Sequence, residues 1–185
     1  WINNTALPSS FVDEIAGKKS KLPGKDLLLS VSVLSNDRAD LANDFTGNPP
    51  NYTAFNDSVI IDAYYKHLSY LINELDPKYL VMSIEGNELL INSPNKWDGY
   101  KLLISDVRLR IKNDHPDMMI SESVTLHNLF EPNQPDPENY INEVLAHVSQ
   151  MDFMSVSYYP FFKAQTNREE FQEAFDFLHS RVNKP

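Results

Sequence analysis

Residues 79–87 read YLVMSIEGN, a short run of branched and apolar residues that ends in Gly-Asn and is typical of a buried β-strand. Three similar runs occur, at 26–35 (DLLLSVSVLS), 118–125 (MMISESVT) and 152–159 (DFMSVSYY). Between consecutive runs, apolar residues recur every three or four positions, which is the pattern of an amphipathic helix. This alternation of strands and helices predicts a parallel sheet covered by helices.

The helical patterns are clear enough to be given approximate bounds. Their apolar stripes span residues 60–75, 100–111, 141–148 and 171–182. Asp136 and Pro137 supply an N-cap and a first helical residue for the third stripe, and a capping box that begins at Thr166 precedes the fourth. A short helix from about Ser10 to Ala16, ended by Gly17, precedes the first strand. The predicted order is therefore α, β, α, β, α, β, α, β, α.

Small polar residues within the strands favour a barrel over an open sheet. Every predicted strand contains serine, at Ser30 and Ser32, Ser83, Ser121 and Ser123, and Ser155 and Ser157. A strand of an open sheet meets helices on both faces and is apolar almost throughout, whereas a barrel strand turns one face to a narrow interior where small polar side chains fit. We therefore expect an α/β fold, a (β/α)8 TIM barrel.

Four strands cannot close an eight-stranded barrel. The chain begins at Trp1 with no signal peptide before it and stops just after a helical pattern. We therefore expect residues 1–185 to be an incomplete barrel domain that covers roughly the middle half of the fold, strands three to six with their helices.

The composition argues against several classes of function. The 185 residues include 16 basic and 26 acidic side chains, a formal net charge of −10, which argues against a nucleic-acid or anionic-membrane surface. The longest apolar run is too short for a membrane span. The absence of cysteine excludes disulfides, thiolate metal sites and a cysteine nucleophile. Phosphate-loop, zinc-protease, nucleophile-elbow and EF-hand motifs are also absent, so we expect no cofactor and no metal. Oligomeric state stays open.

Loop lengths indicate which end of the barrel carries the site. Connections from helix to strand are brief, whereas those from strand to helix are long, at 36–57, 89–95, 126–135 and 160–165. A long irregular loop in a compact domain is usually functional or disordered. All four lie beyond the carboxyl ends of strands, where the active sites of barrels are found.

Two glutamates lie at this end of the second visible strand, in the segment 84–88 (IEGNE). A carboxyl group beside an amide that can bind a hydroxyl suits general acid catalysis at a glycosidic oxygen, and the alternative is a surface turn with solvated glutamates. Strand alternation places Glu85 toward the barrel interior, whereas Glu88 lies just past the strand. The alternation leaves the direction of Glu122, inside the third strand, open.

Aromatic residues follow the fourth strand in the segment 157–162 (SYYPFF). At a barrel mouth they can form a stacking surface for sugar rings, and the alternative is that Tyr158 and the phenylalanines pack under helices. His127 follows the third strand and either reaches the cleft or lies in a solvated loop. For Arg38, the default is a surface ion pair with Asp37. Trp97 either packs or offers a sugar platform.

Together, the IEGNE segment and the SVSYYPFF segment two strands later resemble the (β/α)8 retaining glycoside hydrolases. Within these, they are similar to the endo-β-1,4-galactanases of glycoside hydrolase family 53 and related uncharacterised proteins. The resemblance covers about Asp26 to Val182. It implies that Glu88 is the acid/base, that Asn87 binds the 2-hydroxyl of the sugar, and that Tyr159, or else Tyr158, hydrogen-bonds the nucleophile.

This chain differs from the family pattern in two respects. The nucleophile of these enzymes is a glutamate after strand seven, so we expect it outside this chain. The position of Glu85 is usually apolar in family 53, so Glu85 either tunes its neighbour or is itself the acid/base.

The function that the resemblance implies is retaining hydrolysis of a β-linked polysaccharide by a secreted protein, extracellular or periplasmic, with a carbohydrate as its substrate. The alternative is a carbohydrate-binding barrel that has lost hydrolytic activity. An unrelated barrel enzyme, such as an aldolase or a metal-dependent hydrolase, needs a lysine or a His/Asp cluster at strand ends. The strand ends here offer His127 and no lysine.

Overall fold

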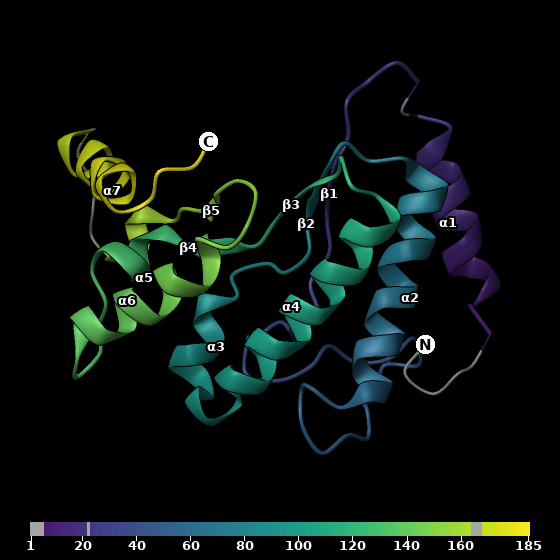
Figure 1. Ribbon diagram of the computed structural model, residues 1–185, viewed down its shortest axis with the longest axis horizontal. Helices are drawn as coiled ribbons and strands as arrows, with labels where there is room; N and C mark the ends of the chain where they lie inside the picture. The colour runs from purple at the N-terminus through teal and green to yellow at the C-terminus, as the bar shows by residue number, and fades with distance from the viewer. Residues whose placement is uncertain (1–5, 22, 164–167) are drawn as a thin grey trace.

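The computed structural model describes residues 6–21, 23–163 and 168–185 (Figure 1). The elements in chain order are α1 (Ser9–Lys19), β1 (Leu28–Ser30), α2 (Ser58–Leu75), β2 (Tyr79–Val81), α3 (Asn87–Asn92), η1 (Pro94–Lys96), α4 (Trp97–Asp114), β3 (Met119–Ser121), β4 (Ser123–Thr125), α5 (Leu126–Phe130), α6 (Pro137–Val148), β5 (Ser155–Ser157), η2 (Pro160–Lys163) and α7 (Arg168–Arg181). The long helices alternate with the strands as the sequence predicts.

The pairs between the strands β1 to β5 of the described residues are parallel. β1, β2 and β3 form one sheet in that order, with Leu80 opposite Leu29 and Ile120. β4 pairs with β5, with Val124 opposite Val156. Because β3 and β4 are two parts of one extended segment, interrupted at Glu122, the four predicted runs lie in chain order side by side. Parallel strands joined through helices in this order are consistent with part of a TIM barrel.

The predicted strand bounds are too long. Each paired ladder covers only three residues. After β1, the Leu34 N–H donates to Ser32 Oγ at 3.1 Å, a local bond that turns the chain away from the sheet. After β2, a bulge replaces the regular ladder. Strand-like composition therefore extends beyond the residues that pair.

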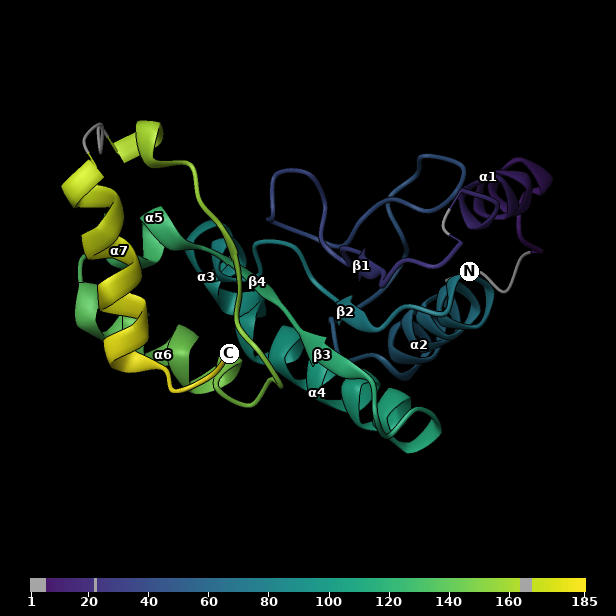
Figure 2. The same ribbon diagram turned by 90° about the horizontal axis from the view of Figure 1, so that it is seen from above.

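Helices α5, α6 and α7 gather at one end of the molecule, and α1 and α2 lie at the other (Figure 2). Two apolar clusters pack the strands against these helices and α4. The first joins the β1–β3 sheet to α2 and α4, and its fully buried side chains include Leu68, Leu80, Ile104 and Ile120. The second joins β4 and β5 to α5, α6 and α7, through residues such as Val124, Leu126, Val144 and Ala174. The predicted helical stripes supply most of these side chains, because their apolar residues share one helix face.

The helix signals are confirmed in part. Asp136 caps α6, its carboxylate accepting from the Asn139 N–H at 3.2 Å, and Pro137 is the first helical residue. The first helix does not end at Gly17 but continues to Lys19. Thr166 lies outside the described residues. The short helices α3 and α5 occupy segments that were predicted as loops. Within the described residues, no helix is both long and apolar enough to cross a membrane.

Candidate functional site

A bulge after β2 presents the Gly-Asn-Glu motif. Met82 N–H donates to Ser121 O at 2.9 Å. The next inter-strand bond of this kind runs from Gly86 N–H to Ser123 O, at 3.0 Å. Between these two bonds the chain advances four residues after β2, from Met82 to Gly86, but only two residues in the neighbouring strand segment, from Ser121 to Ser123. The segment that contains Glu85 therefore carries extra residues. The alternation from which the direction of Glu85 was predicted ends at this bulge.

Glu85 occupies the left-handed region, with φ 59°. This conformation costs a non-glycine residue roughly 1–2 kcal/mol, so neighbouring contacts must hold it. Its N–H donates to Ser123 Oγ at 2.9 Å, and its Oε2 lies 3.1 Å from Arg38 Nη2. Arg38, in the loop after β1, thus pairs with Glu85 and not, as predicted, with Asp37.

Asn87 is buried at the start of α3. Its Oδ1 accepts from the Thr125 N–H at 2.8 Å, and its Nδ2 donates to Thr125 Oγ1 at 2.9 Å and to Tyr140 Oη at 2.8 Å. Burial keeps the pKa of Tyr140 well above its usual range, so this phenol is neutral. Both amide hydrogens of Asn87 are therefore used inside the protein, and the side chain ties α3 to β4 and α6.

Glu88 follows in the first turn of α3, with its side chain partly exposed. Its Oε1 accepts from the Thr125 hydroxyl and from Asn128 Nδ2, the latter at 2.7 Å. Thr125 ends β4 and Asn128 belongs to α5, so the carboxylate lies at the carboxyl end of the parallel strands. We call this end of the strands the mouth, and the sequence predicted Glu88 there.

His127 is buried on α5, close enough to Glu88 and Glu85 to feel their charges. Its Nδ1 accepts from the Tyr159 N–H at 3.3 Å. Burial lowers the pKa of His127, and the charges of Glu88 and Glu85 oppose this shift. His127 is therefore a neutral acceptor in the wall of the site, and neither a solvated loop residue nor a freely exposed cleft residue.

The two adjacent tyrosines after β5 take different directions. The Tyr159 ring is 47% exposed and meets His127 edge-on, with ring centroids 5.9 Å apart. Phe162 also meets His127 at 5.9 Å and is 77% exposed. Tyr158 instead packs against Phe175 of α7, with centroids 5.5 Å apart. Of the two candidates, only Tyr159 joins the exposed aromatic surface that contacts His127.

The mouth thus brings together Glu85, Glu88, His127 and Tyr159, while Asn87 and Tyr158 turn to the surrounding helices. Trp97 packs: it is 3% exposed and stacks on Tyr100.

Sequence reasoning missed Thr125 and Tyr140. For Thr125 a signal existed, because it is the last residue of a strand-like run. Tyr140 carried none, because it resembles any apolar residue of a helix. In the described ranges, no group of three or more histidine or acidic side chains is arranged to hold a metal ion.

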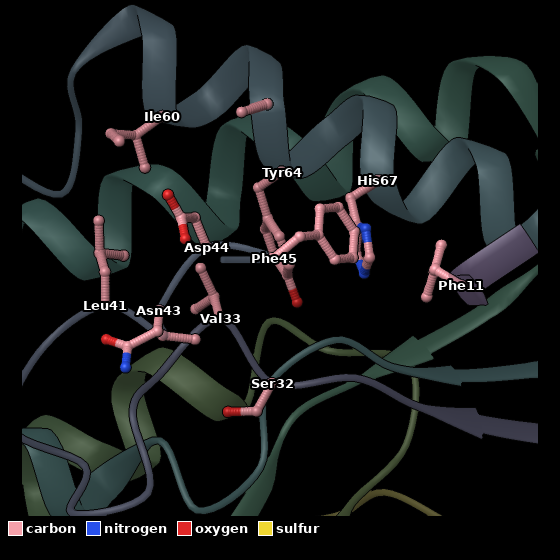
Figure 3. Close-up of a pocket in the computed structure, with 12 residues that line it drawn as sticks. Phe11, Ser32, Val33, Leu41, Asn43, Asp44, Phe45, Ile60, Tyr64 and His67 are labelled. Atoms are coloured by element: carbon pink, nitrogen blue, oxygen red, sulfur yellow. The ribbon is translucent and has the colours of Figure 1, made fainter. Parts of the chain in front are cut away.

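A cavity of about 310 Å³ lies between α1, α2 and the loop after β1, and none of the predicted site residues line it (Figure 3). Its walls are mainly apolar and include Val33, Leu41 and Ile60. The rings of Phe11 and Phe45 contact His67, with centroids 5.7 and 6.0 Å away. Burial among these groups lowers the pKa of His67 to about 4.

Because the pKa of His67 is lowered in the folded state, we expect the stability of the fold to fall in acid. Between about pH 6.5 and pH 4 the unfolded chain binds a proton at His67 that the folded chain does not, so the free energy of unfolding falls as the pH falls. We expect this group to remove about 2 kcal/mol of stability between pH 7 and pH 5. Urea unfolding of the wild type and of His67→Phe at both pH values measures the difference. Equal losses in the two proteins would contradict the prediction.

Comparisons with known proteins give one line of support. No protein-family model matches the sequence, and no curated protein matches it. Among solved structures, the chain is similar to the GH53 catalytic domain of Ignisphaera aggregans, with a TM-score of 0.62 and 16% sequence identity. The match covers 95% of this chain and 48% of that domain, so the chain spans about half the length of its structural neighbour. At this identity the likeness concerns the fold alone, and it supports a fold like that of a glycoside hydrolase catalytic domain.

Proposed function

We propose that the protein is a glycoside hydrolase that cleaves a β-linked polysaccharide with retention of configuration, and that Glu88 is its acid/base. The observation that carries the proposal is the position of Glu88: its carboxylate lies at the carboxyl ends of the strands, held by Thr125 and Asn128. The exposed rings of Tyr159 and Phe162 both contact His127, which lies in the wall of the same mouth. A polymeric substrate also implies an extracellular or periplasmic location.

The chemistry follows from two carboxyl groups about 5–5.5 Å apart. Glu88 protonates the glycosidic oxygen as it leaves, while a second carboxylate, which we place outside this chain, attacks the anomeric carbon. Glu88, now ionised, takes a proton from water, and that water displaces the enzyme carboxylate from the sugar. Hydrogen bonds from Thr125 and Asn128 fix the direction of the Glu88 carboxyl group for both steps.

A second candidate function is carbohydrate binding without hydrolysis. The observation in its favour is Asn87, whose amide hydrogens bond to Thr125 and Tyr140 and do not face a sugar hydroxyl. In addition, Arg38 neutralises Glu85 at the same mouth. Such a protein would hold a polysaccharide over Tyr159 and Phe162 through ring stacking, and no bond would break.

One series of assays distinguishes hydrolysis from binding without hydrolysis. The full-length protein is incubated with β-1,4-galactan, β-1,4-mannan, β-1,4-xylan and β-glucan, and new reducing ends are measured together with binding by affinity electrophoresis. For a substrate that is cleaved, ¹H NMR of the first products shows whether the anomeric configuration is retained. Release of reducing ends with retention supports the proposal. Binding without cleavage, or inversion, rejects it, and binding alone establishes the second candidate.

A further inference from the structure

A buried ionisable group lies directly behind the candidate site. Glu122 is 1% exposed, at the break between β3 and β4. Its Oε1 lies 2.7 Å from Nε2 of His147 on α6, and its Oε2 accepts from the Tyr100 hydroxyl on α4. The sequence left the direction of Glu122 open, and the structure turns it toward the helices. A carboxylate in such a place is costly unless it is paired, so both contacts matter for its position.

The Trp97 ring closes this cluster. It stacks on Tyr100, with ring centroids 5.4 Å apart, and meets His147 edge-on, also at 5.4 Å. Tyr100 and His147 thus contact the two oxygens of Glu122, and Trp97 packs against both of these side chains. Two neighbouring helices, α4 and α6, are joined to the central strand segment through this one side chain.

The same cluster touches Gly86, the residue just before the helix α3 that carries Glu88. A Cβ atom added to Gly86 would overlap the Tyr100 hydroxyl and would lie 3.2 Å from Oε2 of Glu122. Gly86 therefore rests directly on the Tyr100–Glu122 pair, and Glu88 follows two residues later. On its other side, Gly86 is held by its N–H bond to Ser123 O at 3.0 Å.

We infer that Glu122 is a positioning residue: clamped by Tyr100 and His147, it supports the turn at Gly86 and so sets the place of Glu88 at the mouth. This inference rests on the proposed function for its catalytic consequence, though the support of the turn is a property of the fold. Glu122 itself touches no substrate in this arrangement. Its effect on hydrolysis passes through the backbone of residues 84–88.

The test compares three variants of the full-length protein. Glu122→Ala removes both contacts, Glu122→Gln keeps the size and an acceptor for the Tyr100 hydroxyl, and Tyr100→Phe removes one hydroxyl and serves if the alanine variant does not fold. Two readouts are taken: kcat and KM on the cleaved polysaccharide, and hydrogen exchange of the peptide that covers residues 82–90. We expect Glu122→Ala to lower kcat about 10- to 100-fold with little change in KM, and to speed exchange in this peptide. Glu122→Gln should recover most of both losses.

Asp152 provides the matched control. It is also a largely buried carboxylate, 2.7 Å from both Arg108 and Lys112, and it accepts from the Ile120 N–H. Asp152→Ala should lower stability without a change in kcat or in exchange at residues 82–90. Equal effects of Asp152→Ala and Glu122→Ala, or unchanged kcat and exchange in the Glu122 and Tyr100 variants, would overturn the inference. If the wild type cleaves nothing, the proposed function fails, and exchange alone decides the role of Glu122.

Discussion

Replacing Glu88 with glutamine in the full-length protein is expected to lower kcat/KM for polysaccharide cleavage by about 10²–10⁴-fold, the usual contribution of a general acid/base. The amide has nearly the same shape as the acid and still offers an oxygen to Thr125 and Asn128, but its N–H groups are not acidic enough to protonate the leaving oxygen. The measurement is the initial rate of reducing-end release. Binding of the polysaccharide should persist, because the exposed rings of Tyr159 and Phe162, on which we propose that it stacks, are unchanged.

Two comparisons make this loss specific to proton transfer. Glu138→Gln is the surface control, since its side chain is 60% exposed and pairs with Arg181, so its rate should match the wild type. An aryl glycoside with a highly acidic phenol needs little protonation as it leaves, so the first step of Glu88→Gln should be nearly normal on that substrate. A rate loss of the same size on both substrates would point to misfolding and would contradict the assigned role.

The same assay decides between Glu88 and Glu85. Glu85 already has a cationic partner in Arg38 and a strained backbone held by Ser123, which suits a structural carboxylate better than one that gains and loses a proton. We expect Glu85→Gln to reduce the rate by less than about tenfold, well below the range expected of a general acid. If Glu85→Gln is the more damaging change, the acid/base role moves to Glu85.

The main helices were predictable because their signals are local. The stripe from Ile60 to Leu75 lies on one face of α2, and Asp136 with Pro137 starts α6 where expected. The parallel order of the strands also followed from the alternation of elements. The ends of the strands did not, because pairing stops where the Ser32 side chain accepts a hydrogen bond from the Leu34 N–H, which composition does not reveal.

The candidate site was predictable at the level of position but not of direction. The motifs placed Glu88 and Tyr159 at the carboxyl ends of strands, where the structure has them. The direction of Glu85 depends on a bulge that is stabilised by Ser123 and Arg38, 38 and 47 positions away in the chain. Glu122 likewise turns toward its partners on α4 and α6. Contacts between distant segments fix such side chains, and no local pattern encodes them.

The second large effect concerns stability and is expected at Gly86. Its backbone, with φ −57° and ψ −32°, is open to any residue, so the glycine is not required for its conformation. It is required for space, because a Cβ would overlap the Tyr100 hydroxyl, which Glu122 and the stacked Trp97 hold in place. Gly86→Ala should therefore lower the free energy of unfolding by about 3 kcal/mol or more, at the upper end of overpacking costs.

Denaturant unfolding of a double variant tests the cause. In Gly86→Ala/Tyr100→Phe the clashing oxygen is gone, and the nearest remaining atoms, Tyr100 Cζ and Glu122 Oε2, are both 3.2 Å from the new Cβ. The loss caused by the alanine should then shrink by at least half relative to Tyr100→Phe alone. Gly17→Ala is the control, because nothing lies within 4 Å of its Cβ position in helix α1, and there alanine should stabilise by about 0.5–1 kcal/mol. An undiminished loss in the double variant would mean that the Tyr100 hydroxyl is not what restricts Gly86, and it would weaken the link between Glu122 and the turn that carries Glu88.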